Sequence, residues 1–121
     1  MSKEQLWASR KYHVMFHSQK HYNQIRQMMR DGCTIEALQQ TIDAALAQTP
    51  TIGSQLNAIQ HMWGYFKKYA TQEERDMYNA LIAKRNIAAL LHHLRTLATR
   101  YDVQYLQRST VLNIDESGNN N

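Results

Sequence analysis

Apolar residues recur at intervals of three and four along most of this chain, which is the spacing of an amphipathic helix. Strand-like alternation is missing apart from a weak signal at residues 110–112. The pattern therefore predicts an all-α protein. The clearest stripes are Ile52, Leu56, Ile59, Trp63 and Phe66, and then Leu90, Leu91, Leu94 and Leu97.

Short breaks divide the first half of the chain into three predicted helices. The first runs over residues 3–30 and ends at Asp31-Gly32, where glycine suits the left-handed position after a helix. Thr34 is expected to cap a second helix over residues 35–48. The proline of Thr49-Pro50-Thr51 separates it from a third helix over residues 52–69.

The second half predicts two further helices and a short helical segment. Thr71 and Glu74 have the spacing of a capping box, which opens a fourth helix. A break at residues 84–86 precedes a fifth helix over residues 87–100. Residues 103–108 predict one or two additional turns.

Length and composition fit one folded domain. The chain has 121 residues, of which 43% are hydrophobic, so it can build a core. We expect a single-domain helical bundle of about five to six helices over residues 3–112. A polar, disordered tail is expected over residues 113–121.

A single cysteine limits the redox chemistry of this chain. Cys33 alone can form neither an internal disulfide nor an iron–sulfur cluster. No apolar run approaches the roughly 20 residues of a membrane span, and residues 1–4 do not begin a secretory signal. We therefore expect a cytoplasmic protein with no membrane association and no cofactor.

Positive charge is concentrated in the first predicted helix. The chain carries a net charge of +4. Residues 3–30 contain six lysines and arginines against Glu4 alone, whereas residues 31–57 contain three acidic residues and no lysine or arginine. Such a helix suits a polyanionic partner such as RNA, and a solvated helix face is the alternative.

Several polar residues of the first helix need an explanation. Lys11 and Ser18 fall inside its apolar stripe, so Lys11 either packs structurally or contacts a ligand. Arg10, His17 and His21 share one flank, which suits hydrogen bonding to phosphates. His13 lies beside this flank, and two of the three histidines at positions 13, 17 and 21 could bind zinc. No cysteine or carboxylate completes a tetrahedral site, however, and we expect no metal.

A second polar line opposes the apolar stripe of the third helix. Asn57, His61, Gly64 and Lys68 follow one another at intervals of four, three and four. A glycine inside a helix costs about 1 kcal/mol, so Gly64 predicts the close approach of another helix or a ligand. Helix packing that uses Asn57 and His61 to satisfy buried polar groups is the alternative.

Two motifs carry these polar residues, and they resemble the YbgA-like family, a helical bacterial domain of unknown function. The first motif is Lys11, Tyr12, His17, Ser18 and Tyr22. The second is Asn57, His61, Gly64, Tyr65, Phe66 and Lys67. Weaker matches follow at Glu74, Leu81, Ile82, Arg85, Tyr105 and Leu106. The family's Arg-Gly and Pro-Leu segment is missing after Arg85, as is its proline-containing C-terminal motif.

The resemblance implies an accessory or binding module. In many relatives the domain follows an iron–sulfur domain similar to thiouracil desulfurases. There it looks like an accessory domain that helps to bind thiolated uracil or tRNA. This chain resembles the standalone form, because Cys33 cannot build the cluster. A desulfurase-type protein is therefore an implied partner.

The leading hypothesis is an RNA-binding accessory module for tRNA, connected with thiolated-nucleoside metabolism. No catalytic constellation is readable, so the sequence favours a binding protein over an enzyme and assigns no catalytic residue. The candidate RNA-binding residues are Arg10, Lys11, Tyr12, His17, Ser18, His21, Tyr22, Asn57, His61, Gly64, Tyr65, Lys67, Lys68 and Arg85.

Two alternatives remain open. One is a small-molecule-binding protein, or an unrecognised enzyme, with a pocket formed by Lys11, Ser18, Asn57 and His61. The other is a protein-interaction or homodimer module whose methionine-rich and tyrosine-rich faces form the interface.

Overall fold

The computed structural model describes residues 1–114, and regular helices account for most of them. These residues form seven α-helices and one 3-10 helix, which confirms the predicted all-α, single-domain fold. In chain order they are α1 (Lys3–His17), α2 (Gln19–Arg30), α3 (Ile35–Leu46), α4 (Ile52–Trp63), α5 (Gln72–Ala83), α6 (Ile87–Arg100), α7 (Gln104–Gln107) and η1 (Thr110–Asn113).

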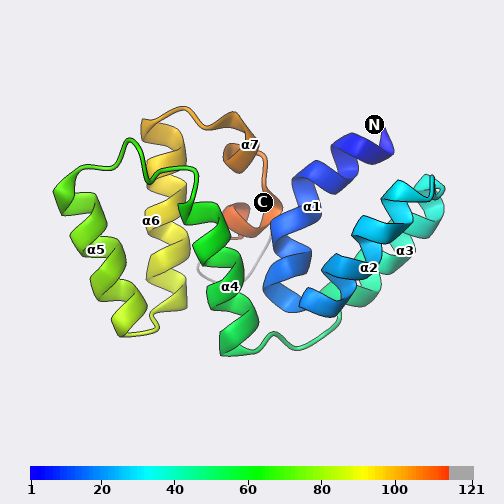
Figure 1. The fold of residues 1–121 in the computed structure, drawn as a ribbon, viewed down its shortest axis with the longest axis horizontal. Coiled ribbons are helices and arrows are strands. Elements are labelled where there is room, and N and C mark those ends of the chain that lie inside the picture. The colour runs from blue at the N-terminus through cyan, green and yellow to red at the C-terminus, as the bar shows by residue number, and fades with distance from the viewer. Residues whose placement is uncertain (115–121) are drawn as a thin grey trace.

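The helices form two groups that meet at α1 and α4 (Figure 1). Helices α5 and α6 lie at one end of the molecule, and α2 and α3 lie at the other. Helix α1 packs on α4, α3 and α2, and it also contacts η1 near the end of the described chain. Helix α1 is therefore the central element, and residues that follow α6 complete its surroundings.

A break at Ser18 corrects the first predicted helix. The single helix over residues 3–30 is wrong, because Ser18 adopts an extended conformation with φ −162° and ψ 107°. The backbone N–H of Ser18 closes α1 on the Val14 carbonyl at 2.7 Å, and its Oγ accepts the His21 N–H at 3.2 Å to cap α2. Serine supports this interruption because its hydroxyl replaces a missing backbone partner. The predicted count of five to six helices is therefore too low.

Helix α4 is shorter than predicted. It ends at Trp63, and residues 64–69 form successive turns in place of the last predicted helical turns. The Tyr65 and Phe66 N–H groups bond to carbonyls three residues earlier, at 3.1 Å and 2.9 Å. The weak strand signal at residues 110–112 is also wrong, since these residues belong to η1.

The predicted caps and breaks are confirmed. Gly32 has φ 77° and follows α2 in the left-handed region, and Thr34 caps α3 by accepting the Ala37 N–H. Thr71 and Glu74 form a reciprocal capping box at α5. The chain then turns at Arg85, which has φ 52° although it is not a glycine.

A single core joins the helices. Large, fully buried side chains come from α1 to α4, α6, α7 and the turn after α4, and each contributes on the order of 1.5–3 kcal/mol through burial. They include Met15, Ile25, Leu38, Ile59, Met62, Phe66, Leu90, Leu94, Leu97 and Leu106. None of the helices in residues 1–114 combines the length and apolarity that crossing a membrane requires. The tail prediction falls mainly on residues 115–121, which lie outside the described residues.

Candidate functional site

An open groove of about 660 Å³ lies where α1 ends and where α2 and α4 begin. We call it the Ser18 groove. It brings together Ser18 and Asn57, which the sequence had placed on separate motifs, and it also includes His17. Its lining residues are His17, Ser18, Gln19, Lys20, Thr51, Gly53, Ser54 and Asn57.

Hydrogen bonds between α1, α2 and α4 fix the shape of the groove. Ser54 Oγ donates to the Phe16 carbonyl at 2.8 Å, so the first turn of α4 bonds to the last turn of α1. Asn57 Nδ2 donates to Gln19 Oε1 at 2.6 Å. Thr51 and Ser54 form a capping box that the sequence did not lead us to predict, although two hydroxyl residues stand at capping-box spacing at the start of an apolar stripe.

The groove favours a negatively charged ligand. Two helix N-termini line it, and the first-turn backbone N–H groups of a helix lack intrahelical partners and carry partial positive charge. Lys20 is exposed at its edge, and no carboxylate is among the residues that line it. Hydroxyl and amide side chains add hydrogen bonds of the kind that position phosphates.

His17 and His21 lie on opposite sides of the break at Ser18. His17 Nδ1 lies 2.8 Å from the Gln48 carbonyl oxygen, and because a carbonyl only accepts, this ring nitrogen donates. His21 Nδ1 lies 2.7 Å from Ser18 Oγ. The continuous flank predicted for Arg10, His17 and His21 is therefore interrupted, since α2 starts anew after Ser18.

Lys11 and His61 lie outside the Ser18 groove. Lys11 is half-buried, with Nζ 5.6 Å from the centre of the Tyr12 ring. His61 is exposed near the end of α4. The four-residue pocket of the alternative hypothesis is thus divided, because only Ser18 and Asn57 line the groove.

Tyr12 and Tyr65 bring the two sequence motifs together inside the fold. Their hydroxyl oxygens are 3.0 Å apart, and the Tyr105 ring centre lies 6.3 Å from that of Tyr12 and 6.0 Å from that of Tyr65. Burial, followed by the bond to Tyr65, raises the pKa of Tyr12. Tyr22 is also buried, against Trp7. Tyr12 and Tyr22 are therefore core residues.

Four other candidates lie away from the groove. Gly64 is exposed, and a Cβ there would meet only the His61 carbonyl, at 3.1 Å. The predicted close approach of another helix is wrong, because Gly64 stands at the end of α4 where the backbone leaves the helix. Lys67, Lys68 and Arg85 are exposed in turns.

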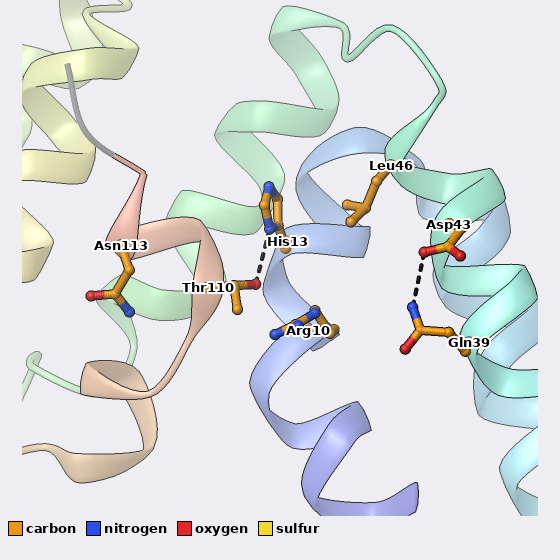
Figure 2. Close-up of a pocket in the computed structure, with 7 residues that line it drawn as sticks. All are labelled: Arg10, His13, Gln39, Asp43, Leu46, Thr110 and Asn113. Carbon is orange, nitrogen blue, oxygen red and sulfur yellow. Dashed lines mark hydrogen bonds between the residues drawn. The ribbon is translucent and has the colours of Figure 1, made fainter. Parts of the chain in front are cut away.

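A second recess, of about 420 Å³, lies between α1, α3 and η1. We call it the His13 pocket, and Figure 2 shows its walls. Arg10 and His13 belong to the polar residues of α1 that stood out in the sequence. The other lining residues come from segments that are distant in the sequence and share no motif. The pocket is lined by Arg10, His13, Gln39, Asp43, Leu46, Thr110 and Asn113.

A chain of hydrogen bonds fixes the protonation of His13. The Thr110 hydroxyl donates its one proton to the Ser9 carbonyl at 3.2 Å. His13 Nδ1, 2.9 Å from the same hydroxyl oxygen, must therefore be the donor. Burial, and then the charges of His17 and Arg10, lower the pKa of His13 to about 4. The ring is neutral at pH 7, and its Nε2 is an acceptor.

Metal ligands do not gather in the described part of the chain. Residues 1–114 contain no group of three or more histidine, cysteine and acidic side chains that could hold an ion. The His13 and His17 ring centres are 5.4 Å apart, but both Nδ1 atoms already have partners within the protein.

Comparison with known proteins places the chain in a family. A family model described as "Protein of unknown function (DUF1722)" matches residues 11–115. A search of curated proteins found no match, and a search of solved structures found none either. Because the matched stretch spans most of the sequence, including the whole Ser18 groove, the chain belongs to the DUF1722 family.

Proposed function

We propose that this domain is an RNA-binding accessory module that holds tRNA phosphates in the Ser18 groove. The observation that carries the proposal is the composition of the groove. Two helix N-termini, the exposed Lys20 and neutral hydrogen-bonding side chains line it, and no carboxylate is among the lining residues. Phosphate oxygens are the ligands that such a surface binds well.

The charge on α1 and α2, the two helices that meet at the groove, supports a polyanion over a single small anion. Lys20 and Arg26 are exposed on α2, while Arg10 and Lys11 are half-buried on α1. Acidic residues are few here, with only Glu4 in α1 and none in α2. A long polyanion can contact several of these cations at once and release condensed counterions from each contact.

The resemblance to the YbgA-like family supports a thiolated-nucleoside context. Its relatives carry the domain next to an iron–sulfur domain similar to thiouracil desulfurases. In this chain Cys33 is the only cysteine, and it is half-buried, with Sγ 3.9 Å from Met29 Sδ. Redox chemistry would therefore come from a desulfurase-type partner, and this domain would hold the RNA.

Two geometric observations favour this proposal over the alternatives. The Ser18 groove is open, and Lys11 and His61 lie outside it, which weighs against a closed small-molecule pocket. The large exposed apolar side chains of the described residues are scattered over separate elements, which weighs against a homodimer face. They are Met1, Ile35, Ile52, Tyr69, Met77 and Tyr105.

A salt series of tRNA binding, with duplex DNA as competitor, tests the proposal. We expect binding that prefers tRNA and weakens linearly in a plot of log affinity against log salt concentration. Lys20→Ala should reduce the magnitude of the slope by about 0.7–0.9, the value of one phosphate contact. Lys84→Ala is the matched control, because Lys84 is an exposed cation at the end of α5, outside the groove.

Gly53→Ala tests whether phosphate approaches the groove backbone. A Cβ at Gly53 would meet only Thr51 Oγ1, at the ordinary contact distance of 3.7 Å, so the fold accommodates it. We expect a stability gain of up to about 1 kcal/mol from the better helix former, together with weaker tRNA binding. Binding that ignores salt, or equal effects of Lys20→Ala and Lys84→Ala, would contradict the proposal.

A further inference from the structure

The His13 pocket holds two opposite charges that do not form an ion pair. Arg10 and Asp43 both line it, yet the ion pair found among residues 1–114 joins Arg100 and Glu74. Figure 2 shows Arg10 on α1 and Asp43 on α3. A simple anion would be repelled by Asp43, and a simple cation by Arg10. The pocket therefore suits a ligand that is neutral overall and has both hydrogen-bond donors and acceptors.

One wall of the pocket pairs a donor with an acceptor. Arg10 supplies guanidinium N–H groups, and His13 supplies the Nε2 lone pair that its bond to Thr110 leaves free. These residues are three positions apart on α1, but Figure 2 shows Nε2 at the end of the His13 ring that points away from Arg10. A ligand that uses both must therefore carry its acceptor and its donor on different edges.

The opposite wall supplies an acceptor. Asp43 accepts one bond, from Gln39 Nε2 at 2.9 Å, and keeps further lone pairs. Asn113 Nδ2 donates to the Gln107 and Ser109 carbonyls, and Figure 2 shows its Oδ1 directed away from Arg10 and Thr110. Leu46 adds an apolar surface. The ligand must accordingly bring at least one N–H group.

We propose that the His13 pocket binds a lactam nucleobase of the guanine or uracil class from an unpaired nucleotide. The proposal rests on the RNA-binding function above and adds base recognition to it. A lactam base offers its C=O group to Arg10 and its N–H group to Asp43. The volume of about 420 Å³ is within the range of about 300–1,000 Å³ of small-ligand pockets.

The pocket and the Ser18 groove are neighbours along α1. The ring centres of His13, which lines the pocket, and His17, which lines the groove, are 5.4 Å apart. A base in the pocket and its phosphate in the groove would thus occupy two adjoining recesses. This arrangement suits a single-stranded or loop nucleotide, because a base in a duplex has its lactam edge already paired.

Titration of the whole ¹⁵N-labelled protein with free nucleosides tests the proposal without any phosphate. We expect guanosine or uridine to shift the backbone signals of Arg10, His13 and Asp43. 1-Methylguanosine and 3-methyluridine lack the ring N–H, and adenosine and cytidine lack the lactam, so each should bind at least about tenfold more weakly. Equal binding of all nucleosides, or none at millimolar concentration, would overturn the proposal.

Matched variants keep the test specific. Asp43→Ala should weaken binding of the preferred nucleoside about tenfold, whereas Glu36→Ala removes another exposed carboxylate of α3 and should not. Arg10→Met should weaken binding similarly, and Arg30→Met is its control on α2. If Asp43→Ala and Glu36→Ala had equal effects, binding would not involve the pocket. Binding of free amino acids in place of nucleosides would identify a zwitterion site and would also overturn the proposal.

The tautomer of His13 provides an independent readout. Imidazole ¹⁵N shifts should show the proton on Nδ1 in the native protein, and Thr110→Val should abolish this preference by removing the acceptor. A native ring protonated on Nε2 would overturn the assignment of the acceptor. Failure of the RNA proposal is separable, since it appears as salt-independent or absent tRNA binding whether or not nucleosides bind.

Discussion

Glu74 and His13 are both buried polar residues, but their surroundings use them in opposite ways. Glu74 is 5% exposed, and the protein itself occupies its carboxylate. Oε1 accepts the Thr71 N–H at 2.8 Å and the Tyr101 hydroxyl at 2.5 Å, and Oε2 pairs with Arg100. His13, at 6% exposed, uses one ring nitrogen internally and leaves the other at a pocket wall.

The comparison shows how to separate structural polar residues from residues that face a ligand. The partners of Glu74 come from the start of α5 and the end of α6, so its bonds hold two helices together. The single bond from His13 to Thr110 holds α1 to η1, and it leaves the second ring nitrogen without a partner in the described residues. Unused bonding capacity, more than burial, therefore indicates where a ligand belongs.

Replacing Glu74 should have the largest effect on stability. Glu74→Ala removes the capping partner of Thr71 and leaves Tyr101 without its acceptor. We expect a loss of about 3 kcal/mol in the free energy of unfolding, at the low end for a broken buried pair because Arg100 is 54% exposed. Urea unfolding measures the loss, and Glu73→Ala is the control because Glu73 is the exposed neighbour.

The nucleosides should still bind the folded fraction of the Glu74→Ala protein. A loss below about 1 kcal/mol would show that Glu74 is dispensable for the fold. A selective loss of tRNA binding without a loss of stability would reverse the comparison and make Glu74 part of the interface.

The pH dependence of stability should separate the two residues. Folded His13 has a pKa lowered from 6.5 to about 4, so the unfolded chain takes up a proton first as the pH falls. The stabilisation present above pH 6.5 is therefore lost progressively toward pH 4. The loss reaches about 2 kcal/mol at pH 5, at roughly 1.4 kcal/mol per pKa unit.

Glu74 acts in a lower pH window. Burial by itself would raise its pKa, but the bonds from Tyr101, Thr71 and Arg100 outweigh burial and lower the pKa to about 2. Its contribution is present above pH 4.5 and is lost toward pH 2. Urea unfolding between pH 7 and pH 3 checks both windows. His13→Asn should remove the pH dependence of the free energy of unfolding between pH 6.5 and pH 4. His92→Asn, at an exposed position of α6, should not.

Replacing Arg85 should have a smaller effect on stability than replacing Glu74, and in the opposite direction. It has φ 52° in the turn between α5 and α6, a conformation that favours glycine. Arg85→Gly should raise the free energy of unfolding by up to about 1 kcal/mol, as measured by urea unfolding. If the variant also weakened tRNA binding more than Lys84→Ala, Arg85 would belong to the RNA interface and would be kept there at the expense of stability.

The sequence predicted the elements that local chemistry determines. Gly32, Thr34 and the Thr71–Glu74 capping box marked helix ends correctly, because each signal acts within four residues. The break at Ser18 escaped detection for a local reason as well. Apolar spacing continues through it, no glycine or proline interrupts it, and a serine inside a helix is ordinarily tolerated.

The candidate site was only partly predictable. Ser18 and Asn57 carried a local signal, since polar residues occupied positions that a core helix does not require. Thr110 and Asp43 carried none, because their role depends on packing against α1. Thr110 bonds to His13 across 97 positions, and no periodicity reports a contact of that range. Lys11 and His61 were placed in one pocket because helical wheels ignore where each helix ends.

The bond from Thr110 to the Ser9 carbonyl spans 101 positions, and it has a consequence for synthesis on the ribosome. Helix α1 is translated about 100 residues before η1, which completes its surroundings. At roughly 5–20 residues per second, the wait between the two is on the order of ten seconds. During that time the nascent chain can form α1 but cannot close the wall of the His13 pocket, so the pocket forms only after η1 has been translated.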